Sequence, residues 1–176
     1  MRVIAGELRG RKLVAPTGEG TRPTADRVRE ALFSILGDVA GARVLDLYAG
    51  SGALGIEALS RGAREAVFVD SAHGAVAAIR ENLEKLGIEG LVHRRDALAW
   101  LAAAEGAQPF ELVFADPPYD SALEAAPLLA EQLPPVLSPD AVIVTESDKR
   151  APLELPFELL RERTYGDTRI AVHRNG

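Results

Sequence analysis

Apolar strand-like segments and helix-like segments alternate along this chain from about residue 43 onward, and this alternation constrains the fold more than any other feature. Segments typical of buried strands lie at residues 42–50, 65–70, 91–96, 110–119 and 140–147. Segments with helical periodicity lie between them at residues 53–62, 73–87, 97–106 and 121–133. This spacing is typical of βαβ units. The sequence therefore predicts an α/β, doubly wound, mainly parallel sheet with helices on both faces.

The end of the chain breaks this pattern. Residues 157–173 predict two strands around a tight turn at residues 165–167. Such a turn has no room for a parallel crossover, so the last pair must be antiparallel, at one edge of a seven-stranded sheet. Within the preceding helical segment, Pro127 predicts a kink or a split.

The first 37 residues differ from the rest. Residues 2–16 predict a small β-hairpin with basic side chains near its turn. A helix is expected over residues 24–36, with Thr24 as its N-cap and Gly37 at its end. We expect one domain over residues 1–176, in which 1–37 form an appendage and 38–176 the core.

Composition excludes several classes of protein. Cysteine is absent, which excludes disulfides, thiolate metal sites and a cysteine nucleophile. The three histidines lie far apart, so no metal is expected. No apolar run approaches a membrane span, and charges and glycines interrupt the first 13 residues where a signal peptide would need an apolar core. We expect a cytoplasmic, monomeric enzyme or binding domain.

Charge is distributed unevenly along the chain. The net charge is −6, yet residues 1–30 contain seven bases and four acids. A basic N-terminal segment on an acidic body is compatible with an edge that faces a polyanion, or with ordinary solvated charge.

Glycines follow the first predicted strand. Gly50-x-Gly52-x-x-Gly55 matches the dinucleotide fingerprint, and Asp70 follows Gly50 by 20 residues, where an acid would bind a ribose. A nicotinamide-dependent oxidoreductase is therefore one interpretation.

Asp46, just before these glycines, favours another ligand. Its charge suits an ammonium group better than a pyrophosphate. S-adenosylmethionine carries an ammonium, a ribose and an adenine but no phosphate. Asp46 and the glycine loop would meet its methionine part, Asp70 its ribose hydroxyls and Asp96 its adenine amine. Alternatively, any one of these acids is only a helix N-cap.

A fourth strand end carries Asp116-Pro117-Pro118-Tyr119. The prolines remove two backbone donors and fix a rigid turn, which leaves a carboxylate and carbonyls as acceptors. Asp116 and the Pro117 carbonyl can each accept a hydrogen of an amine on a planar base, and Tyr119 can stack on that base. Alternatively, the prolines simply end a strand.

These motifs resemble the class I S-adenosylmethionine-dependent amino-methyltransferases. Within that class the whole chain resembles the bacterial guanine-N2 methyltransferases of small-subunit ribosomal RNA, the RsmD type. The resemblance rests on the segments Arg2–Gly6, Arg9–Leu13, Arg22–Thr24, Asp26–Phe33, Ala49–Gly55 and Glu57–Arg61. It implies a Rossmann-like methyltransferase fold and methylation of a guanine N2 in 16S rRNA of the assembled or partly assembled 30S subunit. The family's second acid can be Glu where this chain has Asp70.

The site residues expected on these grounds form three groups. The catalytic group is Asp116, Pro117, Pro118 and Tyr119. The cofactor-binding group is Asp46, Ala49, Gly50, Ser51, Gly52, Leu54, Asp70, Ser71, Asp96, Ala97, Arg22 and Thr24. The RNA-binding group is Arg9, Arg11, Lys12 and Arg27. Whether Arg22 and Thr24 face the cofactor or the RNA stays open, as do methylation of a DNA adenine or cytosine amine and a non-catalytic RNA-binding role.

Overall fold

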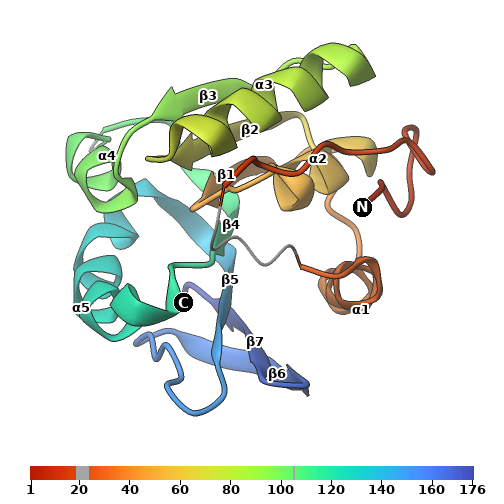
Figure 1. Ribbon diagram of the computed structural model, residues 1–176. Coiled ribbons are helices and arrows are strands. Elements are labelled where there is room, and N and C mark those ends of the chain that lie inside the picture. The colour runs from red at the N-terminus through yellow and green to blue at the C-terminus, as the bar shows by residue number, and fades with distance from the viewer. Residues whose placement is uncertain (19–23, 105) are drawn as a thin grey trace.

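The computed structural model describes residues 1–18, 24–104 and 106–176. Within these residues a central sheet of seven strands has the order β3-β2-β1-β4-β5-β7-β6 (Figure 1). The strands are β1 Arg43–Leu47, β2 Glu65–Asp70, β3 Leu91–Arg94, β4 Phe110–Ala115, β5 Leu137–Asp148, β6 Glu158–Tyr165 and β7 Thr168–Arg174. Pairing is parallel from β3 to β5, whereas β7 runs antiparallel to both β5 and β6. The predicted fold class and the antiparallel edge are confirmed.

Helices cover both faces of this sheet (Figure 1). They are α1 Asp26–Leu36, α2 Ala53–Ser60, α3 His73–Leu86, α4 Ala97–Ala103 and α5 Ala122–Gln132. The first three pack on one face and the last two on the other. Helix α5 continues through Pro127 without a split. None of the described helices combines the length and the apolarity needed to cross a membrane.

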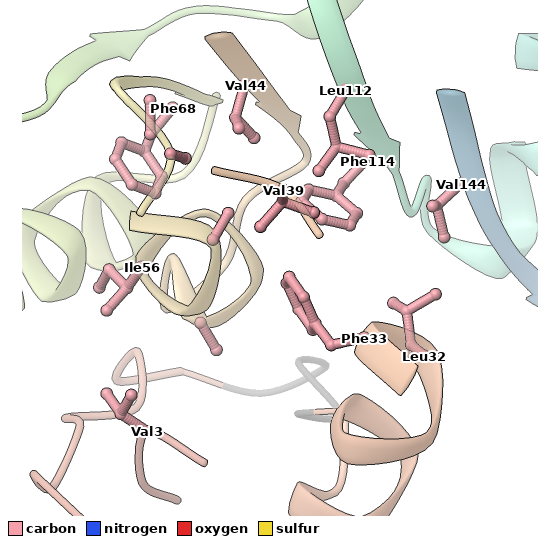
Figure 2. Close-up of a cluster of buried hydrophobic side chains, with 14 of the residues drawn as sticks. Val3, Leu32, Phe33, Val39, Val44, Ile56, Phe68, Leu112, Phe114 and Val144 are labelled. Carbon is pink, nitrogen blue, oxygen red and sulfur yellow. The ribbon is translucent and has the colours of Figure 1, made fainter. Parts of the chain in front are cut away.

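Each face of the sheet has its own core, because side chains alternate between the faces along a strand. We define the first core cluster as the buried apolar side chains on the face of α1, α2 and α3, and the second as those on the face of α4 and α5. In β4, Phe114 belongs to the first cluster and Val113 to the second. Figure 2 shows the first cluster, where the rings of Phe33 and Phe114 lie 5.9 Å apart between centroids. Helix α1 is thereby fixed against the sheet.

The N-terminal arm, residues 1–16, turns back on itself as the predicted hairpin does, but it is shorter than a regular pair of strands. Its two halves pair through one antiparallel bridge between Arg2 and Lys12, flanked by backbone hydrogen bonds from Val3 to Arg11 and from Leu13 to Met1. The backbone N–H groups of residues 4 and 5 instead donate to the carboxylate of Glu57, and those of residues 7 and 8 to Ser60. Because helix α2 takes these donors, they cannot extend a ladder within the arm.

The first helix begins later than predicted. Ala25 stands at its N-cap without a side-chain cap, so the prediction of Thr24 as the cap is wrong. The hydroxyl of Thr24 instead donates to Glu146 Oε2 at 3.0 Å, across 122 residues of sequence. The predicted end is confirmed, since Gly37 has a φ of 72° and its N–H donates to the carbonyl of Phe33.

Candidate functional site

A cavity of about 320 Å³ opens at the carboxyl ends of β1, β2, β4 and β5. Open α/β sheets bind their ligands at this edge. Predicted site residues that line the cavity are Thr24, Asp46, Ala49, Gly50, Ser51, Leu54, Asp70, Ser71, Asp116, Pro117, Pro118 and Tyr119. The cavity therefore brings most of the expected cofactor-binding group together with the whole expected catalytic group.

Four acids in the cavity lining come from the same face of the sheet. Each stands two positions after a side chain of the first core cluster, and side chains two positions apart share a face. The pairs are Val44 and Asp46, Phe68 and Asp70, Phe114 and Asp116, and Val144 and Glu146. Alternation along four neighbouring strands thus gathers four carboxyl groups beside α2.

Enclosure raises the pKa of two of these acids. Asp46 is 2% exposed, and loss of solvation raises its pKa to about 8, with a smaller contribution from the charge of Asp70. A hydrogen bond from the Gly55 N–H, 3.0 Å from Asp46 Oδ2, acts in the opposite direction. The pKa of Asp116 is also raised well above its ordinary value, first by desolvation and then by the charges of Glu146 and Asp46.

The acid after β2 shapes the glycine loop. Asp70 accepts hydrogen bonds from the N–H of Gly50 at 2.9 Å and from the N–H of Ala72 at 2.9 Å. Gly52 adopts a φ of 77° before helix α2, a conformation that favours glycine. A Cβ at Gly55 would lie 2.4 Å from the ring of Phe68, so only glycine fits there. These contacts hold the loop against the cavity.

The Asp116–Tyr119 turn leaves β4 and enters a 3₁₀ turn at Tyr119–Ser121. The Pro118 carbonyl already accepts hydrogen bonds from the N–H and the hydroxyl of Ser121, at 3.0 and 3.2 Å. Tyr119 is 40% exposed as a residue, and its hydroxyl lies 3.4 Å from Thr168 Oγ1, at the start of β7. The turn therefore presents Asp116 and an accessible aromatic ring at the cavity.

Other predicted cofactor residues do not line the cavity. Gly52 shapes the loop through its left-handed backbone conformation before α2, and Ala97 packs in the second core cluster. Asp96 caps α4 by accepting from the N–H of Ala99 at 2.9 Å, which is the N-cap alternative considered for it. Arg22 lies outside the described residues.

Several lining residues were not predicted from the sequence. They are Ala15, Pro16, Tyr48, Ala53, Ala72 and Glu146. Glu146 follows buried residues 143–145 near the end of β5, and Asp46 likewise stands near the end of β1, so the strand-end rule could have found Glu146. Tyr48 follows β1 with a φ of 57°, and desolvation raises its pKa to about 12. No local signal marks Ala15 and Pro16, which reach the cavity through tertiary packing.

The basic side chains of the predicted RNA-binding group lie on the N-terminal arm and α1. Arg9, Arg11, Lys12 and Arg27 are all exposed. The arm is joined to the site by buried Asn82, whose side chain accepts from the N–H of Val14 at 2.7 Å and donates to the carbonyls of Val14 and Ser51, both at 3.0 Å. The arm and the glycine loop are therefore connected through one side chain.

The chemistry of the cavity favours a cationic ligand with hydroxyl and amine donors. Its described lining contains four acids and no base. A pyrophosphate would meet uncompensated like charge there, which disfavours the nicotinamide alternative. Among the described residues, no group of three or more His, Cys, Asp or Glu side chains is placed to hold a metal ion.

Comparisons with known proteins agree over the full length. The family model described as "Conserved hypothetical protein 95" matches residues 1–174. Ribosomal RNA small subunit methyltransferase D of Escherichia coli is 40% identical over 181 residues, covering 99% of this chain and 89% of that protein. The same enzyme of Haemophilus influenzae is 37% identical, covering 99% and 94%. The solved structure of Escherichia coli yhhF, a proposed methyltransferase, superposes with a TM-score of 0.84 at 35% identity, covering 99% and 97%.

The family model matches nearly all of the chain, and the two enzymes do so at sequence identities of 37% and 40%. The protein therefore belongs to the conserved hypothetical protein 95 family, among the methyltransferases of the RsmD type.

Proposed function

We propose that this protein transfers a methyl group from S-adenosylmethionine to the exocyclic N2 amine of a guanine in 16S rRNA of the small ribosomal subunit. The observation that carries the proposal is the cavity in which Asp116-Pro-Pro-Tyr119 meets the glycine loop and a set of carboxyl groups. Membership of the RsmD-type methyltransferases supports small-subunit rRNA as the substrate class.

The residues of the cavity fit the cofactor. When bound, S-adenosylmethionine supplies a methyl group on a positively charged sulfur. In our proposal Asp46 neutralises the ammonium beside the glycine loop, and Asp70 accepts from the ribose hydroxyls. The positive charges of the ligand would offset the mutual repulsion of the carboxylates, since opposite charges stabilise ionised acids.

The base would be held at the Asp116–Tyr119 turn. Asp116 accepts one hydrogen of the amine, and the Pro117 carbonyl accepts the other, because the Pro118 carbonyl is already bonded to Ser121. Tyr119 stacks on the ring, a contact worth about 1–3 kcal/mol. These bonds pyramidalise the amine and direct its lone pair at the methyl, and the charge of Asp116 stabilises the developing cation. Water takes the proton afterwards.

Methyl transfer to different nucleic acids tests this function directly. The protein is incubated with radiolabelled S-adenosylmethionine and one of three acceptors: small subunits lacking the modification, naked 16S rRNA or DNA. We expect label in the small subunits, at the N2 of a guanine after digestion and mass spectrometry. Label only in DNA, or at another base, would overturn the proposal.

Cofactor binding should be visible as thermal stabilisation. S-adenosylhomocysteine, the demethylated product, should raise the Tm by about 5–10 °C at a hundred times its Kd, because the folded state alone binds it. Calorimetry should show this shift and none with NAD. Asp70→Ala should shrink it, since the ribose loses a charged acceptor. A shift with NAD alone would exclude the assigned cofactor.

The raised pKa of Asp46 predicts that ligand binding depends on pH. Because this pKa is about 8, most of the unliganded Asp46 carboxyl is protonated at pH 7 and below. The ammonium group of the ligand favours the carboxylate, so binding releases the proton, and affinity for S-adenosylhomocysteine should rise from pH 5.5 to 7.5 by up to about tenfold per pH unit. Titration calorimetry in two buffers of different ionisation enthalpy measures this release. Asp46→Asn should flatten the dependence, and a flat wild-type profile would show that the carboxyl is already ionised.

The N-terminal arm should contribute RNA affinity through phosphates. Arg9→Ala together with Arg11→Ala is expected to weaken small-subunit binding and to reduce its salt slope by about 0.7–0.9 per lost contact. Cofactor affinity should not change. Filter binding at several salt concentrations gives the slope, and Arg161→Ala with Arg163→Ala on edge strand β6 removes equal charge as a control. If the slope stays the same, another face holds the RNA.

A further inference from the structure

Glu146 is the nearest acidic neighbour of Asp116 in the sheet. Strands β4 and β5 are parallel, and Ala115 is in register with Thr145. The next residue of each chain segment is an acid, so Asp116 and Glu146 stand side by side. Both line the cavity. Two carboxyl groups are therefore presented to whatever planar group is held at the Asp116–Tyr119 turn.

Guanine differs from the other amine-bearing bases in what adjoins its amine. Its N2 amine lies beside N1–H, which is a donor. The amines of adenine and cytosine instead lie beside a ring nitrogen that carries a lone pair. A flipped base is read along this edge. Two neighbouring acceptors thus match guanine, whereas the second of them would face a lone pair in adenine or cytosine.

We propose that Glu146 determines base selectivity by accepting the N1–H of the target guanine while Asp116 accepts a hydrogen of its N2 amine. The inference rests on the proposed function above and extends it from the reacting amine to the choice of base. Desolvation and then the charge of Glu146 raise the pKa of Asp116 in the unliganded site, and two donors on one base edge would relieve the repulsion between the two acids.

Thr24 orients the carboxylate for this role. Its hydroxyl donates to Glu146 Oε2 at 3.0 Å, although the two residues are 122 positions apart in the sequence. Glu146 makes further contacts besides this bond, and because a carboxylate has about four acceptor positions, it can still accept a donor from a base. Thr24 is consequently a positioning residue, and Glu146 is the one that contacts the substrate.

A base analogue separates selectivity from catalysis. 2,6-Diaminopurine retains the N2 amine of guanine but has an acceptor at N1. Once the methylated nucleotide has been mapped, two 16S rRNAs are ligated with guanine or 2,6-diaminopurine at that position and reconstituted into small subunits. The wild-type protein should favour guanine in kcat/KM by about 10- to 100-fold, the usual value of one correct base contact.

Glu146→Gln should remove or invert this preference, because its amide can keep the bond from Thr24 and offer an N–H to the N1 of diaminopurine. Glu158→Gln, the same change on edge strand β6, should leave the preference as in the wild type. The ratio of Kd values for the two subunits gives the same comparison for a variant that turns over slowly. A thermal shift with S-adenosylhomocysteine verifies that the variant is folded.

An unchanged guanine preference in Glu146→Gln would overturn the inference while leaving the proposed function intact. A wild-type protein that methylates neither subunit would overturn the proposed function and this inference with it. Equal loss of activity on both RNAs at a constant ratio would also overturn it, since that result assigns Glu146 to catalysis or structure.

Discussion

Asp116→Ala should reduce the rate of methyl transfer to small subunits by about 100- to 1,000-fold, the cost typical of removing one charge-stabilising group from an active site. The carboxylate both orients the amine and stabilises the cation that forms as the bond is made. Affinity for S-adenosylhomocysteine should remain within a few-fold of the wild type, because the proposed cofactor contacts come from Asp46, Asp70 and the glycine loop. Single-turnover transfer of radiolabel measures the rate, and titration calorimetry measures the affinity.

Two further variants make this test specific. Asp120→Ala removes an exposed acid four residues away in the adjoining 3₁₀ turn, and its rate should match that of the wild type. Asp116→Asn keeps an acceptor oxygen but loses the charge, so its rate should fall between those of the wild type and the alanine variant. If Asp116→Ala retains near-full activity, the amine-orienting role assigned to this residue is wrong.

Local sequence rules predicted the elements whose ends are set by nearby residues. Gly87 ends α3 in the left-handed conformation, with a φ of 66°, as its position after a helical run indicates. The mainly apolar stretch before Asp116 became strand β4, in which every residue except Glu111 is buried. Alternation of strands and helices was enough to predict a doubly wound sheet, because short crossovers leave few other topologies.

The errors lie where a distant side chain replaced a local partner. The hairpin expected over residues 2–16 is reduced to one bridge between Arg2 and Lys12, because Glu57 and Ser60 accept backbone N–H groups of the residues that follow Val3. Thr24 resembled a helix cap, but Glu146, 122 residues later, accepts its hydroxyl. Neither the sequence of the arm nor that around Thr24 indicates these partners, because the contacts form only when the sheet has brought the segments together.

The site was predictable to the extent that strand ends carry motifs. Asp46 and Asp116 were identified because glycines or prolines follow them, and both line the cavity. Glu146 ends the buried stretch of the neighbouring strand without such a motif and was missed. Asp96 shows the opposite case, since it follows a strand yet its side chain caps α4. A strand-end acid therefore needs its helix contacts known before a ligand role can be assigned.

The second large effect concerns stability. Glu57 is fully buried in α2, and its carboxylate accepts from the N–H of Ile4 at 2.8 Å, the N–H of Ala5 at 3.0 Å and Arg61 Nε at 2.8 Å. Its charge also favours ionisation of fully buried Arg29, whose pKa desolvation lowers. Glu57→Ala should lower the free energy of unfolding by about 3–5 kcal/mol, the usual loss when one partner of a buried ion pair is removed.

For a chain of this length such a loss corresponds to a fall in Tm of about 6–20 °C, which calorimetry can measure. Glu81→Ala is the matched control, because Glu81 also pairs with a base four residues later, Lys85 at 2.5 Å, but on an exposed surface. Exposed pairs of this kind contribute only about 0.3–0.5 kcal/mol. Equal effects of the two substitutions would mean that Glu57 does not anchor the arm. A large difference would identify α2 as the support that holds the basic arm beside the cavity.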